Sequence, residues 1–192
     1  DAPIDVLVLE VGMGGEWDST NTADGDVAVF APIDIDHVDR LGSTIAEIAT
    51  VKAGIIKPGA AVVSAAQPEE ALRVIRARAE KEGATLSVDG DGFALEAQTL
   101  AVGGQQLSIR GVAGTYSEVY LPQYGAHQGR NAALAVAAVE SLIGGGTQPL
   151  AAEVVADGLG NATSPGRLQL VGTAPTVLVD AAHNPHGARA LV

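Results

Sequence analysis

The sequence of 192 residues contains no cysteine. It therefore offers no disulfide framework, no thiolate nucleophile and no cysteine-bound zinc site, and it fits a reducing compartment. It also lacks a run of about 18 apolar residues, which a membrane-spanning helix would need. The opening DAPIDVLV lacks the basic segment of a signal peptide. We therefore expect a soluble, cytoplasmic protein with no membrane partner.

Aromatic residues and positive charges are scarce. Aromatics make up 3% of the chain, and 11 Lys and Arg stand against 23 Asp and Glu, which gives a formal net charge of -12. An acidic surface repels a phosphate backbone, and few rings are available to stack on bases, so we expect no nucleic-acid partner. The same field would repel a nucleotide or a carboxylate substrate. Binding either one would require a metal cation and arginines placed at the site.

Two apolar runs predict the frame of the fold. Residues 6–9 and 27–30 are rich in β-branched side chains and are bounded by Gly, Asp and Pro, as in strands buried on both faces of a parallel sheet. Polar groups that could bind a ligand follow both runs: Glu10 after the first, and Asp34, Asp36, His37 and Asp39 after the second. Open α/β sheets bind ligands beyond the carboxyl ends of their strands, so we expect a site here.

The segment after the second run continues the alternation of strand and helix. A helix is predicted over 43–57, with Ser43 or Thr44 as its N-cap, because apolar residues recur there at helical spacing. A strand at 61–64 and an amphipathic helix at 68–81 follow. This order of elements predicts an α/β fold.

The pattern changes after residue 84. Residues 85–121 contain short alternating segments separated by glycine, which predicts a small antiparallel sheet or edge hairpins. Helices are predicted at 128–143 and 150–159, and the turn at 164–167 is interpreted as a domain linker. A buried strand at 176–179 ends at an aspartate, where a second strand-to-helix unit is expected to begin.

Glu10 and His37 are candidate metal ligands. One histidine together with carboxylate oxygens suits Mg²⁺ or Mn²⁺ better than a structural zinc site, which usually takes nitrogen or sulfur ligands. Each residue also has a purely structural interpretation. Glu10 could cap or pair with a neighbour, and His37 could be a helix cap or a core histidine. The residues alone leave both interpretations open.

Lys52 is unusual because it lies between Val51 and Ala53 in a helix with an apolar face. Such a lysine often extends its ammonium group to the surface. If it faced the metal instead, an ammonium about 4 Å from a dication would be repelled by roughly 8 kcal/mol at an effective dielectric near 20. A neutral amine, or a carbamate formed with CO₂, would avoid this repulsion. A carbamate would also be an anionic ligand acceptable to a hard cation.

Six motifs in a fixed order resemble one protein family. They are EVGMGGxxDxTN at 10–21, IDHxxxLG at 35–42, KAGI at 52–55, HQxxNAAxA at 127–135, SPGR at 164–167 and DAAHNP at 180–185. Together they resemble the folylpolyglutamate synthase and dihydrofolate synthase branch of the Mur ligase superfamily. Each motif alone is a weak signal, but their shared order spans nearly the whole chain.

The resemblance implies a fold and an activity. It implies an α/β Mur-ligase-type central nucleotide-binding domain over 1–163, with a mostly parallel sheet flanked by helices and a small antiparallel sheet. Residues 164–192 would be a linker and the start of a Rossmann-like C-terminal domain. The activity implied is an ATP-dependent ligase, acting as a monomer, that adds L-glutamate to folate or to dihydropteroate through an acyl phosphate.

The resemblance also implies roles for single residues. Glu10 and His37 match the family's magnesium ligands, and Lys52 matches its carbamylated lysine, which would bind the same Mg²⁺ (or Mn²⁺) and take part in catalysis. Four residues match positions at ATP or at the reacting groups: Asn131 at the adenine, Arg167 at the phosphates, Asp180 at the nucleotide, and His183 at the γ-phosphate or the incoming glutamate.

Two departures from the family pattern and two missing segments limit what is expected. Glu16 stands where the family usually has arginine, and Val51 stands where it usually has glutamate. The family's phosphate-binding P-loop and its folate-contacting segments would precede Asp1, and most of the C-terminal domain would follow Val192, so we expect this fragment alone to be inactive. Two alternatives remain, another Mur-type amide ligase and a non-catalytic relic of the fold.

Overall fold

The computed structural model describes residues 3–182, 187 and 188. Its contacts divide the chain into two compact units. The first unit contains residues 1–62 and 67–86, and the second contains residues 63–66 and 87–192. This division does not coincide with the expected domain boundary between 163 and 164, which stays a prediction.

A three-stranded sheet in the order β1-β2-β3 forms the first layer of the fold. Its strands are β1 (Val27–Phe30), β2 (Ala61–Ser64) and β3 (Thr85–Val88). The N–H of Ala61 donates to the carbonyl of Asp26 at 2.9 Å, and the N–H of Thr85 donates to the carbonyl of Ala60 at 3.1 Å. Because the strands therefore start side by side, the sheet is parallel, as the helical connections between them require.

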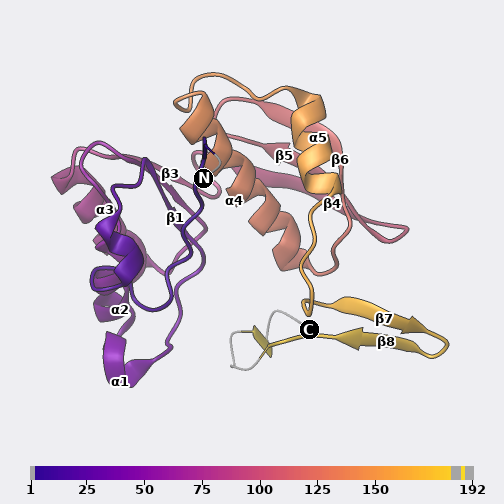
Figure 1. Ribbon diagram of the computed structural model, residues 1–192, viewed down its shortest axis with the longest axis horizontal. Helices are drawn as coiled ribbons and strands as arrows, with labels where there is room; N and C mark the ends of the chain where they lie inside the picture. Colours follow the sequence, from indigo (N-terminus) through magenta and orange to yellow (C-terminus); the bar gives the residue numbers. More distant parts are fainter. Residues whose placement is uncertain (1–2, 183–186, 189–192) are drawn as a thin grey trace. The chain divides into compact units, whose positions relative to one another are not determined.

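Helices cover one face of this sheet (Figure 1). The covering helices are α2 (Ile45–Ala53) and α3 (Glu69–Lys81). The same unit contains the 3₁₀ turn η1 (Ser19–Thr22) and the short helix α1 (Val38–Leu41). The helices α2 and α3 pack against each other. The core holds Phe30 and Val62 from the sheet and Ile48 and Ile75 from the helices, all at most 4% exposed. Full burial of such a side chain contributes about 1.5–3 kcal/mol to folding.

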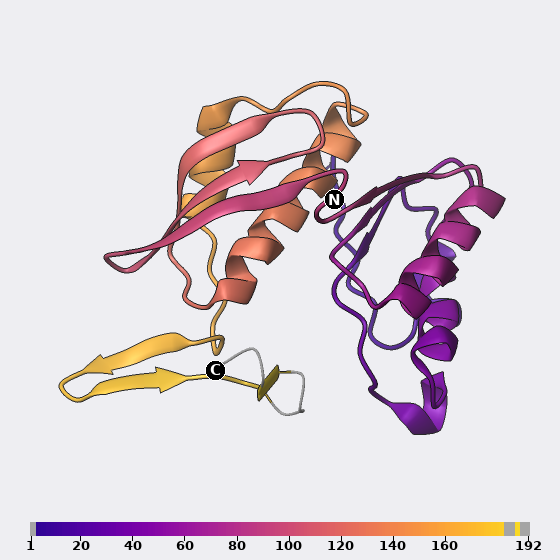
Figure 2. The ribbon, with the colours of Figure 1, turned by 180° about the vertical axis from the view of Figure 1, so that it is seen from behind.

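The second unit is built on an antiparallel sheet in the order β4-β5-β6. Its strands are β4 (Ala94–Ala101), β5 (Gly104–Arg110) and β6 (Thr115–Leu121). The helix α4 (Ala126–Ile143) packs on β4 and β5, and α5 (Ala152–Gly160) packs on β6. The buried face of α4 is rich in alanine, which lets the helix lie close to the sheet (Figure 2).

A hairpin follows α5. Its strands are β7 (Gln169–Thr173) and β8 (Thr176–Val179), which pair in antiparallel register and are joined through a cis peptide bond between Ala174 and Pro175. All four residues of β8 are exposed. The prediction of a buried strand at 176–179 is therefore wrong about burial, because the segment pairs with β7 alone and no helix of the described residues packs on it.

The predicted α/β fold, with a parallel sheet and small antiparallel sheets, is confirmed. The predicted strand at 6–9 is wrong for the described residues. That segment has no regular structure, and Val6, Leu7 and Val8 are 55%, 64% and 88% exposed. A run that is apolar on both faces forms a strand only beside another strand. Within the part of the chain that the structure describes, β2 is the only strand that pairs with β1.

Two other boundaries differ from the prediction. The helix predicted over 43–57 ends at Ala53, because Gly54 and Ile55 turn the chain with N–H bonds to the carbonyls of Val51 and Lys52. The segment 85–88, predicted within the small antiparallel sheet, instead extends the parallel sheet. Among the described residues, no helix has both the length and the apolar character that crossing a bilayer requires.

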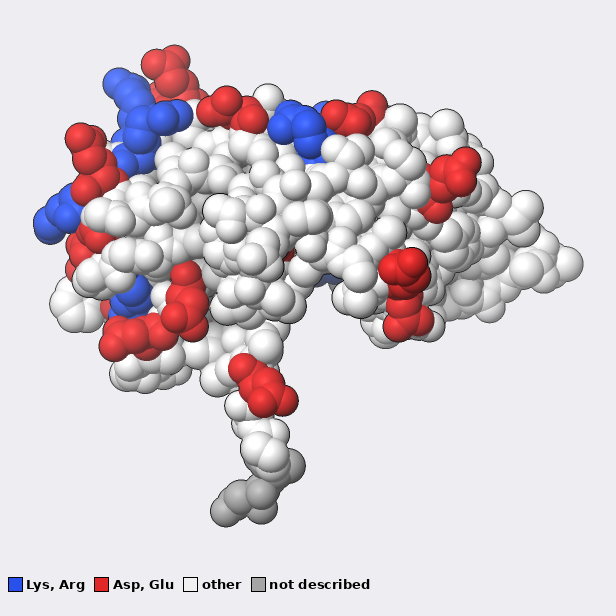
Figure 3. Space-filling view, turned by 90° about the horizontal axis from the view of Figure 1, so that it is seen from above, with Lys and Arg blue, Asp and Glu red and all other residues white. Residues whose placement is uncertain are grey.

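Charged side chains of both signs are interspersed on the surface. Figure 3 shows lysines and arginines lying among aspartates and glutamates. Arg78 pairs with Glu82 one helical turn further along α3 at 3.2 Å, and Arg110 pairs with Glu96 across β4 and β5 at 3.5 Å. Ion pairs that solvent can reach contribute little to stability, so these two pairs do not determine the fold.

Candidate functional site

The glycine turn at 12–15 packs against the end of α2, the helix that carries Lys52. A Cβ atom on Gly15 would lie 2.8 Å from the carbonyl oxygens of both Val51 and Lys52. The N–H of Glu16 donates to the carbonyl of Val51 at 2.9 Å. Only glycine permits this close approach of the two backbones. The turn that follows Glu10 is therefore fixed to the last turn of the lysine helix.

Asp18 holds the same turn in shape. Its carboxylate accepts the hydroxyl hydrogen of Thr20 at 2.7 Å and the backbone N–H groups of Thr20 and Met13 at 3.0 and 3.1 Å. These donors, the Thr20 hydroxyl foremost, lower the pKa of Asp18 from 3.8 to about 2. Asn21 also fixes the turn, because its side-chain amide donates to the backbone carbonyls of Glu16 and Gly54 at 3.0 and 3.2 Å.

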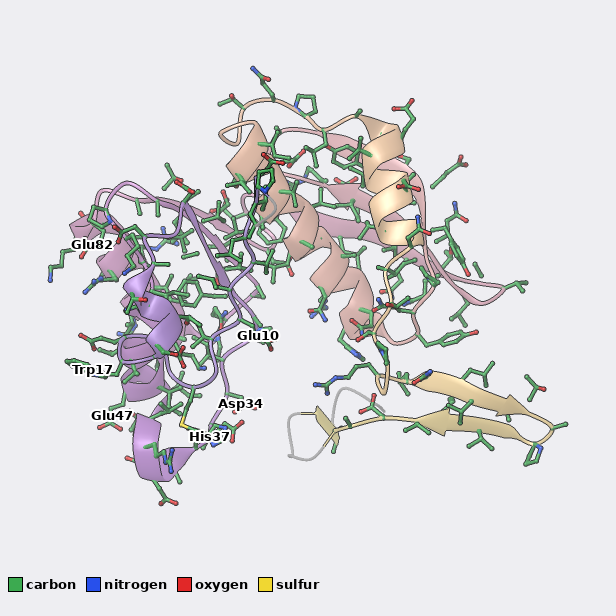
Figure 4. All side chains as sticks on the ribbon, in the orientation of Figure 1. Glu10, Trp17, Asp34, His37, Glu47 and Glu82 are labelled. Atoms are coloured by element: carbon green, nitrogen blue, oxygen red, sulfur yellow. The ribbon has the colours of Figure 1, made fainter. Side chains whose placement is uncertain are left out.

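A cavity of about 420 Å³ lies beside this turn in the first unit. Its wall combines apolar and charged side chains, among them Met13, Trp17, Arg40, Leu41 and Val51. Trp17 is 86% exposed, and in Figure 4 it lies on the side of the unit where the helices are. A concave surface with an exposed indole and an arginine can bind a flat anionic molecule through stacking and ion pairing.

His37 has an unusual backbone conformation. It precedes α1 with φ 49° and ψ 43°, in the left-handed region, which is uncommon for a residue with a side chain. Its N–H donates to a carboxylate oxygen of Asp36 at 2.8 Å, and its Nε2 lies 3.9 Å from the other oxygen. The imidazole is exposed. Strain of this kind persists where the surroundings enforce it, often at functional sites.

The three predicted metal ligands lie on different segments of the chain. Glu10 is exposed in the irregular segment, His37 is exposed before α1, and Lys52 is half-buried in α2. In Figure 4, Glu10 lies on the same side of the unit as Asp34 and His37. Among the residues that the structure describes, no three His, Asp or Glu side chains are placed to hold one metal ion. The convergence of Glu10, His37 and Lys52 stays a prediction.

The donor chemistry of these residues nonetheless suits magnesium. Glu10 makes no hydrogen bond or ion pair with another described residue, so both carboxylate oxygens are available as hard ligands. The exposed imidazole of His37 offers a nitrogen ligand, and the Asp36 carboxylate beside it can orient the ring.

Asn131 lies in the first turns of α4, and its side chain is exposed. Its amide nitrogen donates to the side-chain oxygen of Gln128 at 3.0 Å, which fixes the direction of the amide. An amide carries both a donor and an acceptor. Held in one orientation, it can pair with the edge of a purine base.

Arg167 and Asp180 are brought together by the turn that precedes β7. The carboxylate of Asp180 accepts the N–H of Ala182 at 2.7 Å and the N–H of Leu168 at 2.8 Å. These two donors, with a smaller effect of the positive charge of Arg167, lower the pKa of Asp180. Arg167 is exposed. His183, predicted near the γ-phosphate, lies outside the described residues.

Several residues of the site were not predicted. Asp18, Thr20 and Asn21 belong to the motif at 10–21, but no role was predicted for them. The pattern D-x-T-N directly after a glycine turn is nevertheless a signal for side chains that bind the local backbone. Gln98 and Gln105, which contact the start of α4, were missed. The sequence offers no signal that separates them from surface glutamines.

Comparison with known proteins supports one family. The profile of the Mur ligase middle domain matches residues 1–139. The chain is 48% identical, over its whole length, to 41% of the Mycobacterium tuberculosis dihydrofolate synthase/folylpolyglutamate synthase. It is 38% identical, over 98% of its length, to 44% of the Bacillus subtilis protein of the same name. The chain thus spans less than half the length of these relatives.

Solved structures agree. The M. tuberculosis folylpolyglutamate synthase complexed with ADP superposes with a TM-score of 0.93 at 46% identity, over 98% of this chain and 42% of that one. A folylpolyglutamate synthase complexed with AMPPCP and folate gives a TM-score of 0.91 at 33% identity, over 95% of this chain and 45% of that one. The likeness therefore covers both units of the chain.

Proposed function

Because this chain belongs to the folylpolyglutamate synthase and dihydrofolate synthase branch of the Mur ligase family, we propose that the protein containing it is an ATP-dependent ligase. It adds L-glutamate to a folate, to dihydropteroate, or to both, and acts as a monomer. The observation that carries the proposal is the 48% identity to the M. tuberculosis enzyme over the whole chain. The ADP and folate complexes of similar structures support it.

The proposed reaction has two steps. A carboxylate oxygen of the pterin substrate attacks the γ-phosphorus of ATP, the bond to the bridging oxygen breaks, and ADP leaves. The amine of glutamate then attacks the carbonyl carbon of the acyl phosphate and loses a proton. Inorganic phosphate leaves with one oxygen of the original carboxylate, and an amide remains. Such a sequence depends mainly on orientation of the two substrates and on charge neutralisation.

Glu10, His37 and a carbamylated Lys52 are the proposed ligands of a Mg²⁺ (or Mn²⁺) ion. When bound, the ion would neutralise phosphate oxygens of ATP. The contact of Gly15 with the carbonyl of Lys52 ties the segment after Glu10 to the helix of Lys52, so both ligands are connected through one rigid turn. Val51 supports this turn, since its side chain would lie 3.0 Å from a Cβ atom on Gly14. Glu16 is exposed, so its charge stays solvated.

The proposed nucleotide contacts come from the second unit. Asn131 pairs with the adenine, and the exposed guanidinium of Arg167 neutralises phosphate oxygens by bidentate hydrogen bonds. Asp180 keeps the turn around Arg167 in shape through its bonds to Leu168 and Ala182, and its negative charge balances the arginine. His183 faces the γ-phosphate or the incoming glutamate in this proposal.

The test uses the full-length protein with MgATP and L-glutamate, and with dihydropteroate, tetrahydrofolate or a peptidoglycan precursor in separate reactions. The proposal expects a glutamyl product, with one ADP per amide bond, from at least one pterin and none from the precursor. Product from the precursor alone would identify another Mur-type ligase. A ligand that binds only the folded protein raises its stability by about 2.7 kcal/mol at 100 times its Kd. No stabilisation of the full-length protein by MgATP would favour the non-catalytic alternative.

A further inference from the structure

A buried glutamine in β5 holds the segment that leads into α4. Gln105 is 2% exposed, and its amide nitrogen donates to the backbone carbonyls of Gln123 at 2.8 Å and Gly125 at 3.1 Å. Buried polar groups require partners, and this side chain finds both of its acceptors in the residues just before the helix. The sheet is thereby fixed to the N-terminal end of α4.

Gln98 on β4 strengthens the same connection. Its amide nitrogen donates to the side-chain oxygen of Gln105 and to the carbonyl of Gly125 at 3.4 Å. The carbonyl of Gly125 also accepts the N–H of Gln128, in the first turn of α4, at 3.1 Å. Gly125 has φ +96°, a conformation that residues with side chains rarely adopt. Gln98 and Gln105 therefore both hold the Gly125 carbonyl, which accepts the N–H of Gln128 at the start of α4.

The connection continues to Asn131. Gln128 is 8% exposed, and its side-chain oxygen accepts the amide hydrogen of Asn131 at 3.0 Å. A Cβ atom on Gly129 would lie 3.1 Å from the amide of Gln98, so the first turn of α4 packs directly on this glutamine. A continuous path of hydrogen bonds thus runs from the two strands to an exposed asparagine amide.

We propose that Gln105 and Gln98 are positioning residues for nucleotide recognition. They hold the first turn of α4 so that the Asn131 amide presents its donor and acceptor to the base in one fixed direction. This inference rests on the proposed function, which gives Asn131 the adenine. Loss of the positioning weakens base recognition, because the free protein then samples orientations that do not pair with adenine.

The test measures the dissociation constants of ATP and GTP for variants of the full-length protein by calorimetry. Gln105→Leu and Gln98→Leu are each expected to weaken ATP binding by about tenfold, the loss of roughly one hydrogen bond to a base, while GTP binding changes little. The matched control is Gln106→Leu. Gln106 neighbours Gln105 on β5 but faces the other side of the sheet, so its replacement leaves both constants unchanged.

Further measurements separate positioning from a general structural role. If the variants weakened ATP binding and GTP binding by the same factor, the inference would be overturned. Gln98→Leu keeps the hydrogen bond from Gln105 to Gln123, so it provides the test if Gln105→Leu does not fold. Unchanged ATP affinity in Gln98→Leu would also overturn the inference. The double variant Gln105→Leu, Asn131→Ala should bind ATP no more weakly than Asn131→Ala alone. Fully additive losses would contradict the inference.

Asn131→Ala distinguishes the two levels of the proposal. If this variant binds ATP as tightly as the unmodified protein, the adenine contact itself is wrong and the inference falls with it. If Asn131→Ala weakens ATP binding and the two glutamine variants do not, only the positioning role is wrong.

Discussion

The hydroxyl group of Tyr116 donates a hydrogen bond of 2.6 Å to the carboxylate of Glu140 in the interior of the second unit. Glu140 is fully buried, and it also accepts the N–H groups of Ala113 and Gly114 at 3.1 and 2.9 Å. The Tyr116 oxygen in turn accepts the N–H of Leu150 at 2.8 Å. This network anchors the C-terminal half of α4, the helix whose other end carries Asn131.

Replacement of Tyr116 by phenylalanine should destabilise the fold. Tyr116→Phe removes the hydroxyl donor from the buried carboxylate of Glu140, which keeps only the N–H groups of Ala113 and Gly114, and leaves the N–H of Leu150 without this acceptor. The free energy of unfolding should therefore fall by about 1–3 kcal/mol. Tyr120→Phe is the matched control, because that hydroxyl contacts only the exposed carbonyl of Val102. Urea unfolding of both variants checks this, and equal losses would contradict the role of the network.

The same tyrosine predicts a pH dependence at high pH. Burial and the Glu140 carboxylate raise the pKa of Tyr116 from 10.0 to about 12. A raised pKa means that the folded state favours the neutral phenol, so this stabilisation is present below pH 10 and is lost as the pH rises through 12. The stability difference between the unmodified protein and Tyr116→Phe should shrink over that range. A constant difference would show that the phenol is not protected.

Loss of one hydroxyl at the glycine turn should change stability in acid. Thr20→Val removes the foremost cause of the low pKa of Asp18. A lowered pKa stabilises the fold above pH 3.8, and this contribution is lost as the pH falls towards 2. The variant should therefore be less stable than the unmodified protein at pH 5 and approach it at pH 2. Thr22→Val is the control, since that hydroxyl donates to the Ser19 carbonyl instead.

The helix that carries Lys52 depends on its cap. The Thr44 hydroxyl accepts the N–H of Glu47 at 3.2 Å, and the Glu47 carboxylate accepts the N–H of Thr44 at 3.1 Å. Thr44→Ala should lower the free energy of unfolding by about 1 kcal/mol. Thr50→Ala should change it little, because this threonine is exposed within the same helix and bonds only to the carbonyl of Ala46. A similar loss in both would argue against the cap.

Removal of the Lys52 side chain tests the proposed carbamate. In the full-length protein, Lys52→Ala should abolish ligation because the anionic metal ligand is lost. A short-chain carboxylic acid should restore part of the rate, whereas bicarbonate should not. Lys81→Ala, at the exposed end of α3, is the control and should retain full activity. Unchanged turnover in Lys52→Ala would rule out the carbamate.

The sequence predicts local structure well where a pattern and its boundary signals are both local. Apolar runs between breakers predict β1 and β2 with their observed limits, and the capping signal at Ser43 or Thr44 predicts the start of α2 close to where it lies. The prediction of a strand at 6–9 was wrong because a strand also needs a neighbouring strand to pair with, and apolar composition does not identify that neighbour. The strand at 176–179 was predicted, but its partner β7 was missed for the same reason.

At the candidate site, too, the sequence predicts which residue types occur but not which distant segments meet. Residue types near strand ends suggested Glu10, His37 and Lys52, but their convergence depends on how separate segments come together, which no local pattern encodes. Gln105 and Gln106 are neighbouring residues of the same type. Only the register of β5 decides which of the two is buried and hydrogen-bonded to the start of α4.

The most direct measurement of the proposed reaction follows oxygen from substrate to phosphate. The full-length protein would turn over MgATP, L-glutamate and a pterin substrate whose carboxylate carries a heavy-oxygen label, and the released phosphate would be examined by mass spectrometry. The acyl-phosphate account requires one labelled oxygen in each phosphate and an equal amount of glutamylated product. Unlabelled phosphate, or phosphate release without a new amide bond, would contradict it.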